Sequence, residues 1–125
     1  MSQTFSRKIR VPKIPGRGLG RQIGFPTFNF AITPALLAPA LPTGVFAGFL
    51  NQKKAVIFCG PRKSFDQVFA LEVHLLNFQD EDLIEAEIAF GPKIRAIQKF
   101  ATLSALQKQI QKDCVLAGRI LANGN

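Results

Sequence analysis

No charged residue occurs between Gln22 and Gln52, and a run of this length could cross a membrane as a helix. Proline excludes that structure, because each proline removes a backbone donor and interrupts a helix. The N-terminal residues also lack the apolar core of a signal peptide. We therefore expect a soluble, cytoplasmic protein without membrane contact, in which this run forms short strands and loops. The prolines of the run are Pro26, Pro34, Pro39 and Pro42.

Short apolar or alternating stretches, bounded by glycine, proline or polar turns, predict five or six strands. In one of them Leu71, Val73 and Leu75 lie on one face, so Glu72 and His74 share the other, because strand side chains alternate. The expected strands are residues 6–14, 27–32, 44–50, 54–60, 68–78 and 84–90. Pro12 would place the first strand at a sheet edge, and Gly91-Pro92 would end the last one. The strands 44–50 and 54–60 would form a hairpin through residues 51–53.

The last part of the chain predicts a single amphipathic helix, since its apolar residues recur at spacings of three and four. Ser104, with Gln107 three residues later, has the pattern of a capping box at the helix start. Gly124 lies just past the expected end. The apolar stripe consists of Leu103, Leu106, Ile110, Cys114, Ala117 and Leu121.

Short sequential strands followed by one helix favour a mainly β protein, an antiparallel barrel rather than a parallel sheet. With 125 residues and 47% hydrophobic content, the chain is long enough for one domain over 1–125, with loose ends at 1–6 and 122–125. Cys59 and Cys114 sit among apolar neighbours, so we expect them to act as small hydrophobic residues and not as a disulfide framework.

Positive charge gathers in the first half of the chain. Ten of the sixteen basic residues precede Asp66, the first acid, and the net charge is +8. This distribution indicates an anionic partner, which could be a polyphosphate, a nucleic acid or an acidic membrane surface. A solvated basic surface is the alternative interpretation.

Residues 16–24 form a glycine-rich loop that also contains Arg17 and Arg21. Backbone without side chains can approach phosphate oxygens closely, and arginine adds charge and paired hydrogen bonds. The loop matches neither a Walker loop nor a Rossmann fingerprint. An anion-binding loop and an ordinary turn therefore both explain it.

Thr27 and Asn29 are two residues apart on an extended segment and project to the same face. Hydroxyl and amide carbonyl oxygens are hard donors that suit magnesium shared with phosphates. Capping of a turn beside Pro26 would explain the same two residues.

Glu72 is the only acid between Asp66 and Asp80 and lies in an otherwise apolar strand. In phosphoryl transfer a carboxylate can accept the proton of the attacking hydroxyl. The alternative is an outward-facing glutamate on a solvated sheet face. His74, the only histidine, has no second ligand at metal spacing and fits a structural role better than a metal role.

Four segments resemble, in order, motifs of the ATP-dependent riboflavin kinase family. "GRGLGRQIGFPTFN" resembles its glycine-rich loop and Pro-Thr-x-Asn motif, and "GVFAGFL" resembles its Gly-Val-Tyr strand. "LEVHLLNF" resembles its Glu-Val-His strand. "IRAIQKFATLSALQKQIQKD" resembles its Arg-x-x-x-Lys-Phe segment and terminal helix. The resemblance runs from about residue 8 to residue 121.

The resemblance implies a six-stranded antiparallel Greek-key barrel with a C-terminal helix. It implies transfer of the ATP γ-phosphoryl group to the 5′-hydroxyl of riboflavin, which gives FMN. Glu72 would be the general base, and Thr27 and Asn29 would hold Mg²⁺ or another divalent cation. The flavin would be bound by Arg95, Lys99 and Phe100. The ATP phosphates would be bound by Gly16, Gly18, Leu19, Gly20, Arg21, Pro26 and Thr27.

Two positions depart from the family pattern. Lys63-Ser64 stand where the family has Pro-Thr, and Ile84-Glu85 stand where it has Tyr-Gly. These departures motivate an alternative, a non-catalytic barrel that binds flavin or nucleotide. Specific nucleic-acid binding is not expected, because the chain has no Tyr or Trp and its phenylalanines mostly occupy core-like positions. We expect a monomer that needs a separate FMN adenylyltransferase for FAD synthesis.

Overall fold

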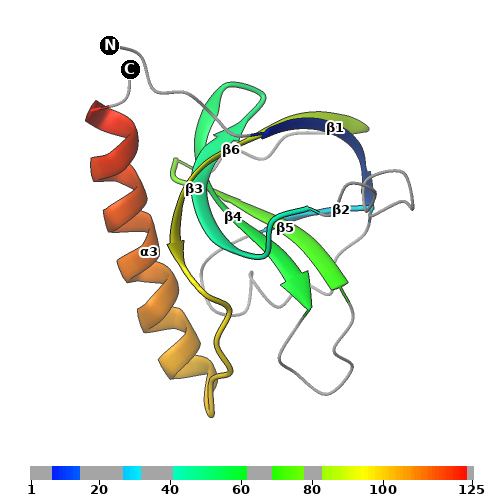
Figure 1. Cartoon of the computed structure of the whole chain (residues 1–125). Helices are drawn as coiled ribbons and strands as arrows, with labels where there is room; N and C mark the ends of the chain where they lie inside the picture. Colours follow the sequence, from blue (N-terminus) through cyan, green and yellow to red (C-terminus); the bar gives the residue numbers. More distant parts are fainter. Residues whose placement is uncertain (1–6, 15–26, 32–40, 62–68, 78–82, 124–125) are drawn as a thin grey trace.

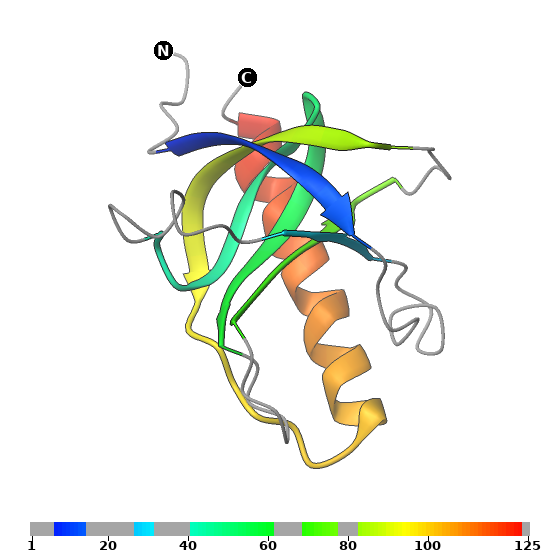
Figure 2. The ribbon, with the colours of Figure 1, turned by 90° about the vertical axis from the view of Figure 1, so that its right-hand side faces the viewer.

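The computed structural model describes residues 7–14, 27–31, 41–61, 69–77 and 83–123. Within these ranges six antiparallel strands close into a barrel, and one helix lies along its outside (Figures 1 and 2). This confirms the predicted barrel with a C-terminal helix. The elements are β1 (Arg7–Ile14), β2 (Phe28–Phe30), β3 (Gly44–Leu50), β4 (Lys53–Pro61), β5 (Phe69–Leu75), β6 (Glu85–Arg95) and α3 (Leu103–Asn123).

The strand order around the barrel is β1-β2-β5-β4-β3-β6, so β2 pairs with β5 and not with its sequence neighbour β3. Strands β3, β4 and β5 follow one another through adjacent pairings, and β2 lies beside the far member of the three. This is the Greek-key arrangement. The pairing of β2 with β5 is the one that brings the candidate site residues together.

Alternating side chains of all six strands fill the barrel interior. Leu50, Ile57 and Ile88 are at most 1% exposed. The rings of Phe46 and Phe90 meet edge to face, with centroids 5.4 Å apart and planes at 84°. Each such large side chain stabilises the fold by about 1.5–3 kcal/mol through burial. The predicted common face of Leu71, Val73 and Leu75 is confirmed, and it is the inner face of β5.

A second apolar cluster joins α3 to the outer face of the barrel. Ala117 and Leu121 pack against Val45, Ala47 and Val56 of β3 and β4. The predicted helical stripe is confirmed from Ile110 to Leu121, whereas Leu103 at the start of the helix is exposed. Among the described residues, no helix has both the length and the apolar character that a membrane crossing requires.

Several predicted boundaries were wrong: β2 and β5 are shorter than the expected 27–32 and 68–78, and three further errors have a physical reason that the structure shows. The hairpin loop is Asn51-Gln52 alone, with φ of 48° and 71°, and β4 begins at Lys53. Two consecutive positive φ values are the geometry that lets a two-residue loop follow the twist of its strands. The third residue of the predicted loop is therefore part of the strand.

The second error concerns Gly91-Pro92, which does not end β6. Gly48 pairs with Phe90 and Phe46 pairs with Lys93, so two residues of β6 oppose a single residue of β3. This is a β-bulge, a position where proline is tolerated because the ladder hydrogen bond is already interrupted. The strand therefore continues to Arg95.

The third error concerns the start of α3. The backbone N–H of Ala105 donates to the Thr102 hydroxyl at 3.0 Å, and the helix begins at Leu103. Thr102 is therefore the N-cap, and Ser104 lies inside the first turn. At the other end the helix continues to Asn123, beyond the point where a loose end was expected.

Candidate active site on the outer face of the barrel

The polar residues singled out in two distant segments meet where β2 pairs with β5. Asn29 is directly opposite Glu72 in the register of these strands. Thr27 precedes β2 and lies beside His74, with its Oγ1 3.4 Å from the imidazole Nδ1. Because Phe28 and Val73 of the intervening pair point into the core, these four polar side chains share the outer face.

His74 contacts this group through the side chain of Thr27. It is a buried polar residue, 9% exposed, and its ring reaches the Thr27 hydroxyl. A hydroxyl held by an imidazole loses rotational freedom, so the Thr27 oxygen is presented in a restricted direction. The predicted structural role of His74 is consistent with this contact.

The donor set of the site suits a hard cation shared with a phosphate. Within the described part of the chain, no three His, Cys, Asp or Glu side chains are close enough together to enclose a metal ion. The oxygens of Thr27 and Asn29 are instead of the type that binds Mg²⁺ when phosphate completes the coordination, and the Glu72 carboxylate lies opposite Asn29. The residues present therefore fit the expected divalent cation.

Phe58 is the next residue along the outer face. It pairs with Glu72 across β4 and β5, and Val45 pairs in turn with both Phe58 and Arg95. Asn29, Glu72, Phe58, Val45 and Arg95 thus form one row across five strands. Val45 is covered by α3, whereas Phe58 is half-buried at the margin of the same cluster. The row therefore has polar residues at both ends, Asn29 and Glu72 at one and Arg95 at the other, and apolar residues between them.

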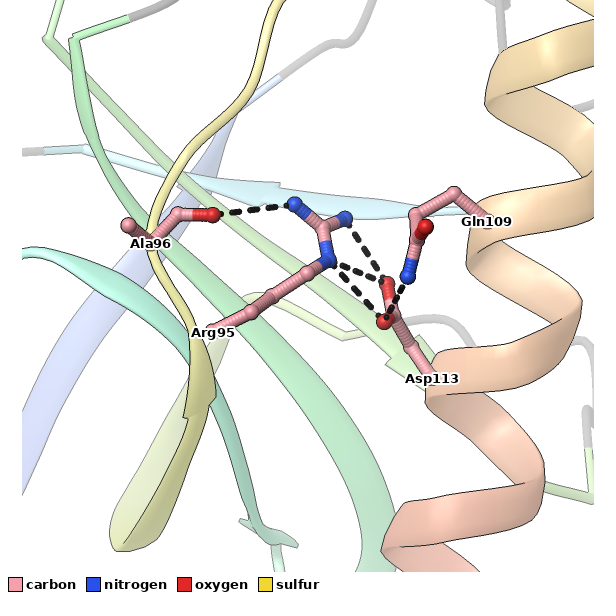
Figure 3. Close-up of polar contacts among 4 residues, drawn as sticks. All are labelled: Arg95, Ala96, Gln109 and Asp113. Atoms are coloured by element: carbon pink, nitrogen blue, oxygen red, sulfur yellow. Dashed lines mark hydrogen bonds and ion pairs between the residues drawn. The ribbon is translucent and has the colours of Figure 1, made fainter.

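Arg95 is held by an ion pair with the helix (Figure 3). Its Nε lies 2.9 and 3.1 Å from the two carboxylate oxygens of Asp113, and its Nη2 donates to Oδ2 at 2.8 Å. Gln109 Nε2 donates to Asp113 Oδ1 at 3.0 Å, and Arg95 Nη1 donates to the Ala96 carbonyl at 3.2 Å. The Asp113 side chain is 2% exposed and that of Arg95 15%. The pair is therefore largely shielded from solvent.

The segment from Arg95 to Thr102 connects the row to the helix. The Arg95 guanidinium carbon lies 5.7 Å from the centroid of the Phe100 ring, within the range of a cation–π contact. Ile97 packs onto Gly60, where any β-carbon would collide with its side chain. Gly60 also has a φ of 148°, which favours glycine independently.

The structure brings some of the predicted site residues together and separates others. Glu72, Thr27 and Asn29 form one group, while Arg95 and Phe100 lie at the opposite end of the row. Lys99 is exposed. The predicted phosphate-binding residues Gly16, Gly18, Leu19, Gly20, Arg21 and Pro26, and the departure at Lys63-Ser64, lie outside the described residues.

The departure at Ile84-Glu85 lies at the surface. Ile84 is 85% exposed, and Glu85 forms an ion pair with Arg10 of β1. Both residues stand at the entry to β6, which pairs with β1 and β3 and not with β2 or β5. The described polar contacts of this departure are to β1, since the Ile84 carbonyl also accepts from the Lys13 N–H at 2.8 Å.

Sequence reasoning missed Phe58, Gln109 and Asp113. A signal for Asp113 was present, because it lies three residues after Ile110 and four before Ala117, within the apolar stripe. An acid at such a position needs a buried partner. The partner could not be named from the helix alone, because Arg95 reaches it through the fold.

Cys114 follows Asp113 on α3 and is half-buried where the helix packs on the barrel. Burial, and then the neighbouring Asp113 carboxylate, raise the pKa of the Cys114 thiol to about 11. Both causes disfavour the thiolate. The interpretation of Cys114 as a small hydrophobic residue is in keeping with this environment.

Comparison with known proteins identifies the family of the chain. The family model described as "Flavokinase: Riboflavin kinase" matches residues 4–121. The chain is 33% identical over 119 residues to the bifunctional riboflavin kinase/FMN adenylyltransferase of Bacillus subtilis, covering 88% of this chain and 37% of that protein. It is 35% identical over 107 residues to the protein of the same name from Haemophilus influenzae, covering 80% of this chain and 34% of that protein.

A solved structure supports the fold. It is described as a macrolide-efflux protein from Streptococcus pneumoniae and superimposes with a TM-score of 0.68 at 23% identity, over 85% of this chain and 36% of that one. At this identity the likeness concerns the barrel alone. The chain spans only about a third of these relatives, and the family match extends over nearly all of its residues. The chain therefore belongs to the riboflavin kinase (flavokinase) family.

Proposed function

We propose that this chain is a riboflavin kinase that transfers the γ-phosphoryl group of ATP to the 5′-hydroxyl of riboflavin, giving FMN and ADP. The observation that carries the proposal is the pairing of Asn29 with Glu72 on the outer face, in a chain of the riboflavin kinase family. A carboxylate beside hard oxygen donors is the set that phosphoryl transfer to an alcohol needs.

In the proposed reaction, the hydroxyl oxygen of riboflavin attacks the γ-phosphorus and the bond to the ADP oxygen breaks. The hydroxyl proton passes to the Glu72 carboxylate. A divalent cation, when bound, neutralises phosphate charge, and Thr27 and Asn29 are the residues that would hold it. His74 restrains Thr27 at the same place. The remaining barrier is lowered mainly by positioning and charge stabilisation.

The other assignments follow from the family. The glycine-rich residues Gly16 to Arg21 would bind the ATP phosphates through backbone N–H groups and arginine charge. The 95–100 segment would lie over the flavin ring.

The test is incubation of the purified chain with riboflavin, ATP and MgCl₂, followed by chromatographic separation of riboflavin, FMN and FAD. We expect FMN, and equal amounts of ADP. Omission of MgCl₂ in the presence of EDTA should abolish the product. Riboflavin binding without any FMN would reject the kinase proposal in favour of the non-catalytic flavin-binding alternative.

A further inference from the structure

We propose that Asp113 is a positioning residue for flavin binding, which acts by orienting Arg95 and, through it, the Phe100 ring. This inference rests on the proposed function and deepens it. In this proposal Arg95 connects β6 to α3 through its ion pair with Asp113. Phe100 and Phe58 then make the contact with the flavin ring.

The hydrogen bonds of the pair leave the guanidinium little freedom. Two edges of the Arg95 guanidinium are engaged, one by both oxygens of Asp113 and one by the Ala96 carbonyl. Gln109 prevents the carboxylate from turning, since it donates to Oδ1 from the same side of α3 (Figure 3). A fork-shaped contact of this kind specifies orientation as well as proximity.

The segment 96–101 is attached to the same helix at both ends. Its first end follows Arg95, which is paired with Asp113 in the middle of α3. Its second end is Thr102, which caps α3 and accepts from Ala105 and Leu106. Between the two ends Ile97 rests on Gly60 of β4. The position of the segment on the barrel is therefore set by how α3 is held, and Asp113 is the charged contact that holds it.

Phe58 and Phe100 supply apolar surface at the two ends of the row, one beside Glu72 and one beside Arg95, and Val45 between them is covered by α3. Phe100 is half-exposed beneath Arg95, and Phe58 is half-buried next to Glu72. Adjacent strands are about 4.8 Å apart, so Glu72 and Arg95 are separated by about 14 Å along the sheet. In the proposal the flat ligand contacts these two rings at the margin of α3 and directs a hydroxyl toward Glu72. Removal of Asp113 should then weaken flavin binding and leave nucleotide binding nearly unchanged.

Three variants separate positioning from stability. Asp113→Asn keeps the shape and removes the charge. The double variant Arg95→Met with Asp113→Leu replaces both charges by apolar groups, a change that commonly restores the stability lost when one partner of a buried pair is removed. Arg10→Gln removes the exposed ion pair of β1 and β6 and serves as the matched control.

Riboflavin affinity is measured by quenching of flavin fluorescence without ATP, and the KM of ATP by FMN formation. Hydrogen exchange of residues 96–101 is compared with that of the β3–β4 hairpin. For the double variant we expect riboflavin Kd to rise roughly ten- to hundredfold, because small displacements of binding groups have effects of this size. The KM of ATP should stay within about threefold. Exchange should accelerate in 96–101 and not in the hairpin, and Arg10→Gln should resemble wild type in every measurement.

A folded double variant with wild-type riboflavin Kd would overturn the proposal. So would a parallel loss of riboflavin and ATP affinity, since it would show that the pair only maintains the fold. If wild type binds riboflavin but forms no FMN, the kinase proposal fails, and the riboflavin Kd of the variants still decides the role of Asp113. If wild type does not bind riboflavin, both proposals fail.

Discussion

Two arginine–carboxylate pairs in the described part of the chain differ in burial, and this difference predicts very different contributions to stability. Arg95 and Asp113 have side chains that are 15% and 2% exposed, whereas Arg10 and Glu85 are 63% and 50% exposed. Removing one partner of a buried pair leaves an uncompensated charge and costs about 3–5 kcal/mol. Removing one partner of an exposed pair costs less than about 1 kcal/mol, because water screens both charges.

We therefore expect Asp113→Ala to lower the free energy of unfolding by about 3–5 kcal/mol, and Glu85→Ala by less than about 1 kcal/mol. For a domain of 125 residues, about 4 °C per kcal/mol predicts a fall in Tm of more than about 10 °C for the buried pair. Gln109 makes the loss at Asp113 larger still, because its Nε2 donates to Asp113 Oδ1 and would have no acceptor there in Asp113→Ala.

The measurement is urea unfolding followed by far-ultraviolet circular dichroism, with thermal melts of the same variants. A double-mutant cycle with Arg95→Met isolates the pair from other contacts of either residue. Equal losses for Asp113→Ala and Glu85→Ala would refute the reasoning from burial. A cycle with no coupling between Arg95 and Asp113 would refute it as well.

Three further predictions test the site, the helix cap and the buried thiol. Glu72→Gln should reduce kcat by about 10²–10⁴-fold with an unchanged Tm, measured by FMN formation, because only the proton acceptor is lost; turnover equal to wild type would remove the general-base role. Thr102→Ala should cost about 1 kcal/mol in urea unfolding, while Ser104→Ala costs less than half of that, since only Thr102 bonds the free N–H of Ala105; the reverse order would restore the capping box at Ser104. The pKa of the Cys114 thiol is raised from 9.0 to about 11, because the folded protein favours the protonated thiol. The thiol therefore contributes fully to stability below pH 9, and this contribution is lost as the pH rises toward 11. Two pKa units correspond to about 2.7 kcal/mol, which solvent screening at this half-buried site reduces to about 1 kcal/mol; a Cys114→Ala variant with the same loss of stability over this range would contradict the assignment.

Much of the local structure follows from the sequence, because periodicity is a local property. Alternation placed Leu71, Val73 and Leu75 inside and Glu72 outside, and the spacing of three and four residues predicted the face of α3 that covers the barrel. The ordered motifs predicted the riboflavin kinase family, which the family match confirms. Errors arose where the pairing of strands, and not the local pattern, determines where an element ends. At Gly91-Pro92, for example, a bulge opposite β3 lets the strand continue.

What only the tertiary structure decided is which distant segments meet. Thr27 and His74 are 47 positions apart, and they touch because β2 pairs with β5, a pairing that no turn between sequence neighbours imposes. Arg95 meets Asp113 because α3 packs over β3 and β4 after the chain leaves β6. Local pattern determines which face each residue occupies, whereas the register of non-adjacent strands and the docking of a helix depend on the packing of the whole core. The sequence therefore determined the chemistry of the candidate residues, and the closed barrel decided their arrangement in one row.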